Sequence, residues 1–202
     1  MNTSAKKTKV APSESSTDGR RKRSERSRYA IIKASRALIE GGVLVPTAQQ
    51  ISERAGVGIR SFFRHFTDME SLFEAVDAQG REHVKALFIG GDREGSLAER
   101  VLHAVERRAA GYEDQKNIIM TTAAQSWRYE MLRKRYAHYQ RSLRKDLQDW
   151  LPELKSLGVA DREAVDAVAS AEMWLRLRNQ QGLSKKQSIE VVVSMLTRLM
   201  PQ

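Results

Sequence analysis

Cysteine is absent from this chain of 202 residues, and its absence excludes disulfides and thiolate metal sites. The four histidines, His65, His83, His103 and His138, have no spacing typical of a local metal motif, so we expect no metal site and no cofactor. No apolar run approaches the roughly 20 residues that span a bilayer. The first residues are basic and lack the apolar middle of a signal peptide. We therefore expect a cytoplasmic protein without a membrane partner.

Positive charge is in excess: the chain has 35 Lys and Arg residues against 25 Asp and Glu residues, which gives a formal net charge of +10 at pH 7. Such a balance favours polyanionic partners, nucleic acid before an anionic membrane surface. Residues 1–23 contain too few apolar side chains to repay the entropy of ordering, so we expect a disordered basic arm. The arm ends in Arg20-Arg21-Lys22-Arg23. Two interpretations stay open: a solvated tail, or a segment that binds phosphates or the minor groove.

Proline is also scarce, with only four residues, and no stretch alternates apolar and polar residues for long. The chain after the arm is therefore predicted to be almost entirely helical. A first helix is expected from about Ser24 to Glu40, where Gly41-Gly42 ends it. Thr47 and Gln50 have the spacing of a capping box that opens a second helix.

Later segments bring the expected total to about nine helices. A short third helix covers about Ile59 to His65. Thr67 and Glu70 have the spacing of a second capping box, which opens a fourth helix toward Leu87. Five more helices are expected to begin near Ser96, Tyr112, Ala124, Asp161 and Ser184. The helix from Ala124 to Leu151 is expected to be the longest, and its buried stripe consists of Leu132, Tyr136, Tyr139, Leu143, Leu147 and Trp150.

The segment Thr47 to Phe66, TAQQISERAGVGIRSFFRHF, carries the most specific signal. Its two short helices are joined through Ala55-Gly56-Val57-Gly58, where Gly56 can take the left-handed conformation that a tight helix–helix turn needs. Ile51, Ala55, Val57 and Phe62 are spaced to bury against the first helix. The side chains left outside are those of Gln49, Ile59, Arg60, Ser61, Phe63, Arg64 and His65. A major groove about 12 Å wide accepts such a helix, and most of these polar groups match base edges and phosphates.

Over about residues 24–75 the sequence resembles the tetracycline-repressor (TetR) family of bacterial transcriptional regulators. The resemblance is carried by Ile-Ile-x-Ala-Ser-x-Ala-Leu of the first helix, by Thr47, Ile51 and Ala55-Gly56-Val57, and by Ser61-Phe62-Phe63-Arg64-His65-Phe66 followed by Glu70-Ser71-Leu72. It implies an all-α fold. An N-terminal three-helix helix-turn-helix DNA-binding domain would cover residues 24–75, with its motif at 47–66. A C-terminal helical domain for effector binding and dimerisation would cover residues 76–202.

Three positions depart from the family pattern. Gly58 stands where the family usually has Ser, Phe63 where it has Tyr, and Met69 where it has Lys. The changes remove a capping hydroxyl, a phenolic donor and a phosphate-pairing charge. We expect the Arg-rich arm to offset the weaker grip on the DNA backbone.

The expected DNA-binding residues lie on the two short helices and in the arm. They are Thr47, Gln49, Ile59, Arg60, Ser61, Phe63, Arg64, His65, Arg20, Arg21, Lys22 and Arg23. Arg60 is expected to face the groove floor and Arg64 to lean toward the backbone, although exposed arginines often only solvate a surface. His65 matches a family position that usually touches phosphate. Ile59 either contacts a thymine methyl or is merely exposed.

For the C-terminal domain the resemblance implies a ligand cavity between the middle helices. Its candidate lining is His103, Met120, Thr121, Gln125, Trp127, Met173 and Trp174, each of which can equally be an ordinary core or surface residue. The last two helices read as an antiparallel hairpin, and two such hairpins would form a homodimer as a four-helix bundle. The residues expected at that interface are Val165, Val168, Ala169, Ala171, Leu175, Ile189, Val193, Leu196 and Met200.

Two functions remain open from the sequence. The first is a ligand-responsive repressor that releases a palindromic DNA operator when a small molecule binds the C-terminal domain. The second is a DNA-binding architectural factor, or one controlled by a protein partner, without such an effector. A pocket of a few hundred Å³ with convergent polar groups would favour the first. An enzyme is not expected, because the sequence has no Gly-rich phosphate loop, no nucleophile–base pairing and no metal spacing.

Overall fold

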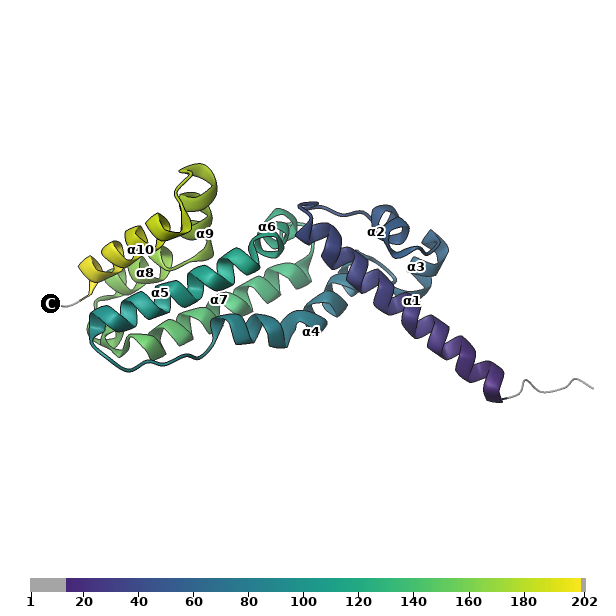
Figure 1. Cartoon of the computed structure of the whole chain (residues 1–202), viewed down its shortest axis with the longest axis horizontal. Helices are drawn as coiled ribbons and strands as arrows, with labels where there is room; N and C mark the ends of the chain where they lie inside the picture. The colour runs from purple at the N-terminus through teal and green to yellow at the C-terminus, as the bar shows by residue number, and fades with distance from the viewer. Residues whose placement is uncertain (1–13, 201–202) are drawn as a thin grey trace, which may run out of the picture.

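A computed structural model describes residues 14–200 of the chain. In that range it forms ten α-helices, one 3-10 turn and one π-helical turn, without β-strands, which confirms the expected all-α fold. The elements are α1 (Glu14–Glu40), α2 (Ala48–Ala55), α3 (Ile59–His65), α4 (Met69–Phe88), α5 (Leu97–Asp114), α6 (Lys116–Gln125), α7 (Glu130–Trp150), η1 (Pro152–Ser156), α8 (Val159–Val168), α9 (Ala171–Leu175), η2 (Arg176–Gln180) and α10 (Lys185–Leu199). We use N-terminal domain for residues 24–75 and C-terminal domain for residues 76–200; α4 runs from one into the other (Figure 1).

Helix α1 begins ten residues earlier than expected, at Glu14, and its first turns project away from the rest of the molecule (Figure 1). The arm predicted to be disordered over residues 1–23 is therefore helical from residue 14, and residues 1–13 lie outside the described residues. Two ion pairs one turn apart join Arg21 to Glu25 at 3.0 Å and Lys22 to Asp18 at 2.8 Å. The segment needs no core of its own, because extending an existing helix costs far less than nucleating one.

The N-terminal domain has a small apolar core formed by α1 to α4. Ile31, Ile51, Phe62 and Leu72 are each 0% exposed and pack in one cluster. Ala55 and Val57, which the sequence also assigned to this core, are half-buried against it. The tight packing fixes the angle between α2 and α3.

The first predicted capping box, which opens the second helix of this domain, is confirmed. The Thr47 side chain accepts a hydrogen bond from the Gln50 backbone N–H at 3.2 Å, and the Gln50 side chain accepts one from the Thr47 N–H at 2.9 Å. Gly56 ends α2 with φ of +66°, the left-handed conformation expected for the turn. The turn geometry then sets where α3 begins.

The second predicted capping box is wrong. Asp68, not Thr67, caps α4, and its carboxylate accepts a hydrogen bond from the Ser71 N–H at 2.8 Å. Asp is at least as good an N-cap as Thr, so the helix begins one residue later than the sequence pattern suggested. Glu70 consequently points elsewhere and accepts a hydrogen bond from the Met131 N–H at 2.7 Å.

Of the helix starts predicted in the C-terminal domain, those near Ser96 and Ser184 are confirmed as the N-caps of α5 and α10, whereas others are wrong. Helix α5 continues through Tyr112, and α6 begins only at Lys116. Helix α7 begins at Glu130 rather than Ala124, because α6 ends at Gln125 in a turn that precedes it. With 27 residues α1 is the longest helix in the described range, ahead of α7 with 21.

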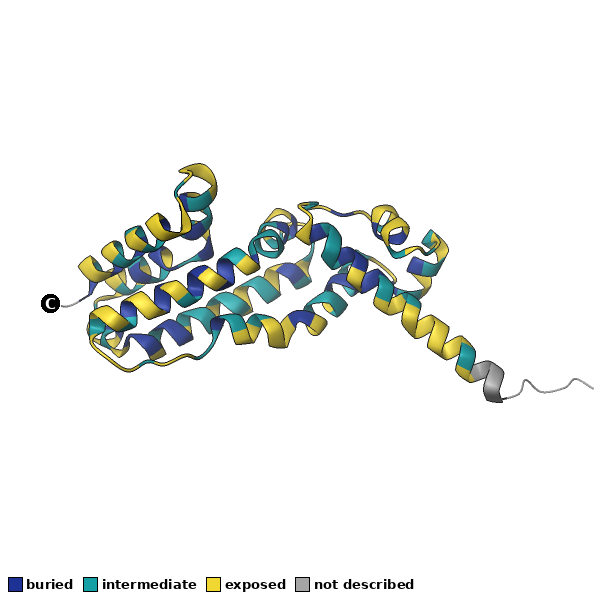
Figure 2. Ribbon diagram, viewed as in Figure 1, coloured by how far each residue is buried: buried dark blue, intermediate teal, exposed yellow. Residues whose placement is uncertain are grey.

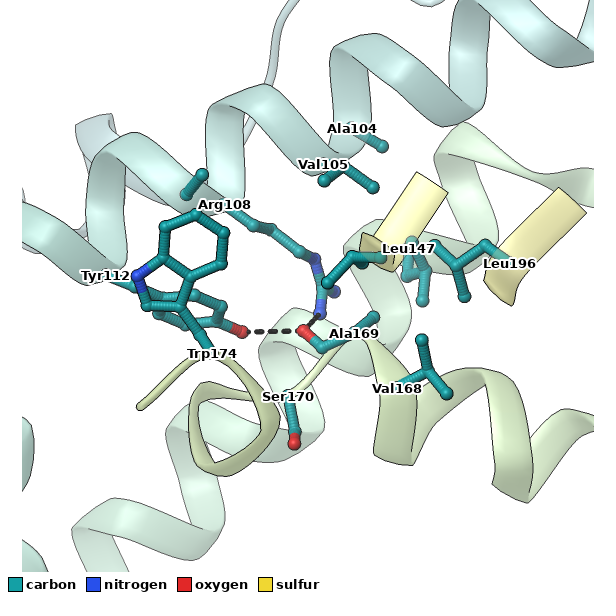
Figure 3. A pocket seen from close by; sticks show the side chains of 12 residues that line it. Ala104, Val105, Arg108, Tyr112, Leu147, Val168, Ala169, Ser170, Trp174 and Leu196 are labelled. Carbon is teal, nitrogen blue, oxygen red and sulfur yellow. Dashed lines mark hydrogen bonds between the residues drawn. The ribbon is translucent and has the colours of Figure 1, made fainter. Parts of the chain in front are cut away.

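The C-terminal domain is held together by α5, which packs against α4 and α10. Figure 3 shows the centre of this packing, where Arg108 and Tyr112 of α5 both donate to the Ala169 carbonyl at 2.9 Å. Arg108 also donates to the Leu143 carbonyl of α7. The break between α8 and α9 at Ala169 is thus fixed by side chains of a distant helix.

The predicted dimer interface needs correction. Most of its residues are buried in the chain's own core, where no partner can reach them: Val165, Val168, Ala169, Ala171, Leu196 and Met200. The reason is that α10 packs against both α5 and α8, so the apolar stripe that suggested a dimer is used within one chain. Leu175, Ile189 and Val193 are half-buried, and their part in an interface stays a prediction.

No helix of the described range is sufficiently long and apolar to span a membrane.

Candidate nucleic-acid interface and ligand cavity

Helix α3 presents two arginines on the outer surface of the N-terminal domain. Phe62 anchors the helix, because its ring is fully buried against α1 and α2. Arg60 and Arg64 are exposed, and the Arg64 guanidinium donates to the Ser61 hydroxyl at 2.7 Å. Arg60 has no ion pair within the described part of the chain. Its five N–H donors are therefore available to an acceptor outside the protein.

Helix α2 contributes Thr47 and Gln49, which are also exposed. Thr47 is engaged as the N-cap of the helix. The Gln49 amide nitrogen donates to a Glu53 carboxylate oxygen at 2.6 Å, so this bond must open or rotate before Gln49 can reach a base.

His65 and Ile59 are less accessible than the sequence suggested. Ile59 is half-buried and packs against the core of the N-terminal domain. The Nε2 atom of His65 is buried, with no hydrogen-bond partner among the described residues. Burial lowers the pKa of His65 below 6.5, and the charges of Arg64 and Arg28 lower it further, so the ring is neutral at neutral pH. A neutral ring is a weaker phosphate ligand than the imidazolium.

The three departures from the expected family pattern have visible consequences. Gly58 is the N-cap of α3 and provides no side-chain hydrogen bond. The ring of Phe63 is 52% exposed and carries no donor. Met69 is half-buried against the core of the N-terminal domain, where a lysine would have reached outward. The surface around α3 therefore has fewer hydrogen-bond donors and positive charges than the family pattern would provide.

The basic residues Arg20, Arg21, Lys22 and Arg23 are exposed along the projecting turns of α1. Figure 2 shows these turns as mostly exposed surface. Arg21 and Lys22 are paired with the carboxylates of Glu25 and Asp18, whereas Arg23 donates to the Gly19 carbonyl at 3.4 Å.

A cavity of about 450 Å³ lies between α4, α6 and α7. Arg36 and Ile39 of α1 line it as well, so the cavity borders the N-terminal domain. Of the seven residues predicted for a ligand site, only Thr121 lines it. The signal that could have located it is the stripe on α7, whose first four members, Leu132, Tyr136, Tyr139 and Leu143, face this space rather than a filled core.

The other six predicted residues lie elsewhere, for reasons that depend on long-range packing. Trp127 is 83% exposed in the turn after α6, and His103 is exposed on α5. Gln125 is buried and donates to the Leu44 carbonyl at 3.0 Å, which ties α6 to the N-terminal domain. Trp174 is buried and donates to Glu113 at 3.0 Å.

Neither of the two predicted methionines lines the cavity. Met120 is half-buried, and its sulfur lies 3.9 Å from the Asn179 amide nitrogen. Met173 packs against the core of the C-terminal domain. Unlike the aromatic and aliphatic stripe of α7, these side chains are used to join helices of one chain.

The polar groups of the cavity converge on Asp77 of α4. Its carboxylate accepts from Tyr139 at 2.8 Å and pairs with Arg81 and Arg135, each at 3.1 Å. Burial and the bond to Asp77 raise the pKa of Tyr139 to about 12. Burial and a hydrogen bond to Glu172 likewise raise the pKa of Tyr136. Both phenols therefore stay protonated and act as donors.

Three hydrogen bonds connect the walls of the cavity to the N-terminal domain. Asn117 of α6 donates to the Glu40 carbonyl at 2.8 Å, at the end of α1. Gln125 reaches the Leu44 carbonyl, and the backbone of Met131 reaches Glu70. These bonds join α6 and α7 to the end of α1, to the loop that follows it and to the start of α4. The described residues contain no group of three or more His, Asp or Glu side chains placed to hold a metal ion.

Comparison with known proteins gives consistent findings. Residues 31–76 match the family described as bacterial regulatory proteins, tetR family, whereas no curated protein matches the chain. A transcriptional regulator from Rhodococcus sp. Rha1 has a TM-score of 0.62 at 14% identity, covering 87% of this chain and 95% of that one. A Rhodococcus sp. protein assigned to the TetR-family transcriptional regulators has a TM-score of 0.56 at 18% identity, covering 88% and 100%. The multidrug binding protein EbrR, complexed with imidazole, has a TM-score of 0.55 at 21% identity, covering 90% and 91%.

Proposed function

We propose that this chain, whose residues 31–76 match the tetR family of bacterial regulatory proteins, is a ligand-responsive repressor that binds DNA through this segment. In this proposal α3 enters the major groove of an operator, and a small molecule in the cavity of the C-terminal domain lowers the affinity for that operator. Because the partner is chromosomal DNA, we place its action in the cytoplasm. The observation that carries the proposal is that the cavity is walled by α1 and α4, the helices that also support α3.

Arg60 and Arg64 are the principal contacts in this proposal. An exposed arginine on a helix that fits the groove matches the O6 and N7 acceptors of guanine. Arg64, one turn later, is held by Ser61 and is assigned to the phosphate backbone. Gln49, Thr47, Ile59, Ser61, Phe63 and His65 complete the proposed surface, with Gln49 dependent on release from Glu53.

A homodimer is part of the proposal, because one short helix gives too small a contact for operator specificity. Two copies related by a two-fold axis would place their α3 helices about 34–36 Å apart, in successive major grooves of a palindromic site. The candidate seam is the outer side of α8 and α10, next to the half-buried Leu175, Ile189 and Val193. Sedimentation at micromolar concentration tests this point, and a monomer would contradict it.

The projecting turns of α1 are assigned a backbone contact. Arg20 to Arg23 are exposed on the first turns of α1, upstream of the part of this helix that packs against α2 and α3. Changing these four residues together to Gln should flatten the slope of log affinity against log salt by roughly 0.9 for each phosphate that the variant no longer neutralises. Folding should not change, since the segment contributes nothing to the core. Superimposable salt curves for wild type and variant would show that the segment is only solvated.

The ligand response is the part that distinguishes the proposal from a DNA-binding architectural factor. A cavity of about 450 Å³ with converging polar groups has the size and character of small-molecule sites. A factor that only bends or packages DNA needs no ligand cavity next to the helices that support its DNA-contacting helix.

The proposal is tested by sequencing genomic fragments captured by the pure full-length protein, with Arg60→Ala as the matched control. Enrichment of a palindromic motif by the wild type and not by the variant would support sequence-specific regulation. Uniform enrichment of all fragments by both proteins would contradict it and favour the architectural alternative. Genes next to the enriched motif then define the compounds to be tested for release of the DNA.

A further inference from the structure

We propose that the cavity of the C-terminal domain takes an amphipathic organic anion, with a long apolar body and one carboxylate that binds Arg135 and Arg81. This inference rests on the proposed function in taking the cavity as the effector site, and it adds the chemical class of the effector.

The apolar body follows from the walls. Phe73, Val76, Val84 and Phe88 of α4 face the cavity together with Ile119 of α6 and Leu143 of α7. The volume of about 450 Å³ is within the range of sites that enclose a whole organic molecule. Such walls reward each buried methylene group of a ligand with roughly a fourfold gain in affinity.

The negative charge of the ligand follows from the ionic groups that line the cavity. Four lining side chains are cationic, Arg36, Arg81, Lys85 and Arg135, and only Asp77 and Glu82 are acidic. Asp77 is already saturated by two guanidinium groups and the Tyr139 hydroxyl. A cationic ligand would therefore find no free buried carboxylate, whereas two arginines that share a single acid retain donors for an anion.

A further cation, Arg108 of α5, lies behind the cavity wall. Arg108 is 5% exposed, and within the described residues it has only carbonyl partners and no carboxylate within 4 Å. Figure 3 shows that Arg108 and Tyr112 reach the same Ala169 carbonyl, and Tyr112 is also one of the residues that line the cavity. A buried charge in a medium of low dielectric acts over several ångströms, so Arg108 adds to the positive potential of the site.

One residue in the wall of the cavity, Thr121, has a hydroxyl without a hydrogen-bond partner among the described residues. Thr121 belongs to α6 and is 4% exposed. Buried hydroxyls are normally satisfied. Thr121 therefore offers an unused hydrogen-bonding group in the wall of the cavity.

The test is calorimetric titration of the full-length protein, without DNA, with straight-chain carboxylates from hexanoate to tetradecanoate below their micelle concentrations. Affinity should rise about fourfold for each added methylene until the cavity is filled. Decanol and decylamine are the matched neutral and cationic probes, and decanoate should bind at least tenfold more tightly than either. Equal affinity for the three head groups, or a preference for the amine, would overturn the inference.

Arg135→Gln separates recognition of charge from packing. The variant should bind decanoate about tenfold more weakly and decanol unchanged. Arg133→Gln is the control on the same helix, because Arg133 is exposed and pairs with Glu130 at 3.5 Å outside the cavity. An equal loss for decanoate and decanol in Arg135→Gln, or a loss for decanoate in Arg133→Gln, would contradict the assigned contact.

The two proposals fail separately. Carboxylate binding that leaves operator affinity unchanged would support the inferred ligand class and contradict the ligand-responsive mechanism. Operator binding that is released by an amine or a neutral compound, without carboxylate binding, would keep the proposed function and overturn the ligand class.

Discussion

The N-terminal domain fills its interior, whereas the C-terminal domain leaves part of its interior open. Ile31, Ile51, Phe62 and Leu72 are all 0% exposed around one another, and the buried polar side chains beside them are only serines. In the C-terminal domain, α4, α6 and α7 enclose about 450 Å³, and buried side chains include Arg108 and other charged or amide groups.

In the proposed function the difference corresponds to two tasks. A helix that reads DNA must be held at a fixed angle, and dense apolar packing resists displacement. A domain that responds to a ligand needs space and polar groups that are satisfied only when the ligand is present. We infer that the N-terminal domain is rigid. When a ligand binds, the C-terminal domain would change the orientation of the two α3 helices of the proposed dimer.

The largest expected effect is on the filled core. Phe62→Ala removes a fully buried ring from a domain too small to rearrange around it, so we expect a loss of about 3–5 kcal/mol in the free energy of unfolding. Chemical denaturation followed by circular dichroism measures the loss. Because the C-terminal domain has its own core, it should stay folded and keep its ligand binding. Loss of both domains in one transition would show that the two cores are not independent.

Arg60→Ala has the next largest effect, and on DNA binding alone. We expect a loss of about 1–3 kcal/mol in operator affinity and relaxed specificity at one base pair, without a change in thermal stability. Arg64→Ala should instead weaken all sequences alike and lower the salt slope. Equal losses on operator and random DNA for both variants would remove the division between groove and backbone.

A residue of the open region gives the contrast to Phe62. Ile119→Ala removes a half-buried side chain from the wall of an existing cavity, so we expect a loss of only about 1–2 kcal/mol in the free energy of unfolding. The same denaturation experiment measures it. A loss as large as that of Phe62→Ala would mean that the cavity is filled in solution by protein atoms.

The smallest expected effect is a gain. Thr121→Val replaces a buried hydroxyl that has no partner among the described residues with a methyl group of similar size. We expect the free energy of unfolding to rise by about 1 kcal/mol, because the unsatisfied group no longer has to be desolvated. A drop in stability would indicate that ordered water already satisfies the hydroxyl.

The same contrast explains how much could be predicted from the sequence. In the N-terminal domain the signals are local: Thr47 and Gln50 lie three residues apart, and Gly56 marks its own turn, so α2 and α3 were predicted within one residue. The C-terminal domain depends on partners far apart in sequence. Gln125 bonds a carbonyl 81 residues away, and Asp77 bonds Tyr139 at a separation of 62.

Most of the failed predictions concern features that a local sequence pattern does not reveal. The stripe on α7 was correctly expected to face inward, but the periodicity of one helix cannot tell a filled core from a cavity. Val165 and Leu196 were expected to form an interface, since an apolar face does not reveal whether it packs against its own chain or a second copy. The extension of α1 was missed because a helix can grow outward from a packed segment without contacts of its own.

The central claim is that ligand binding in the cavity and operator binding by α3 are energetically coupled. The most direct test measures the affinity of a compound that binds the wild type but not the cavity-filled variant Ile119→Trp, first with the free protein and then with the protein saturated by operator DNA. Linkage requires that the DNA weaken the binding of the compound by the same factor by which the compound weakens the binding of DNA. We predict equal factors of about 5–150, the usual range of such coupling. Identical affinity of the compound with and without DNA would contradict the account.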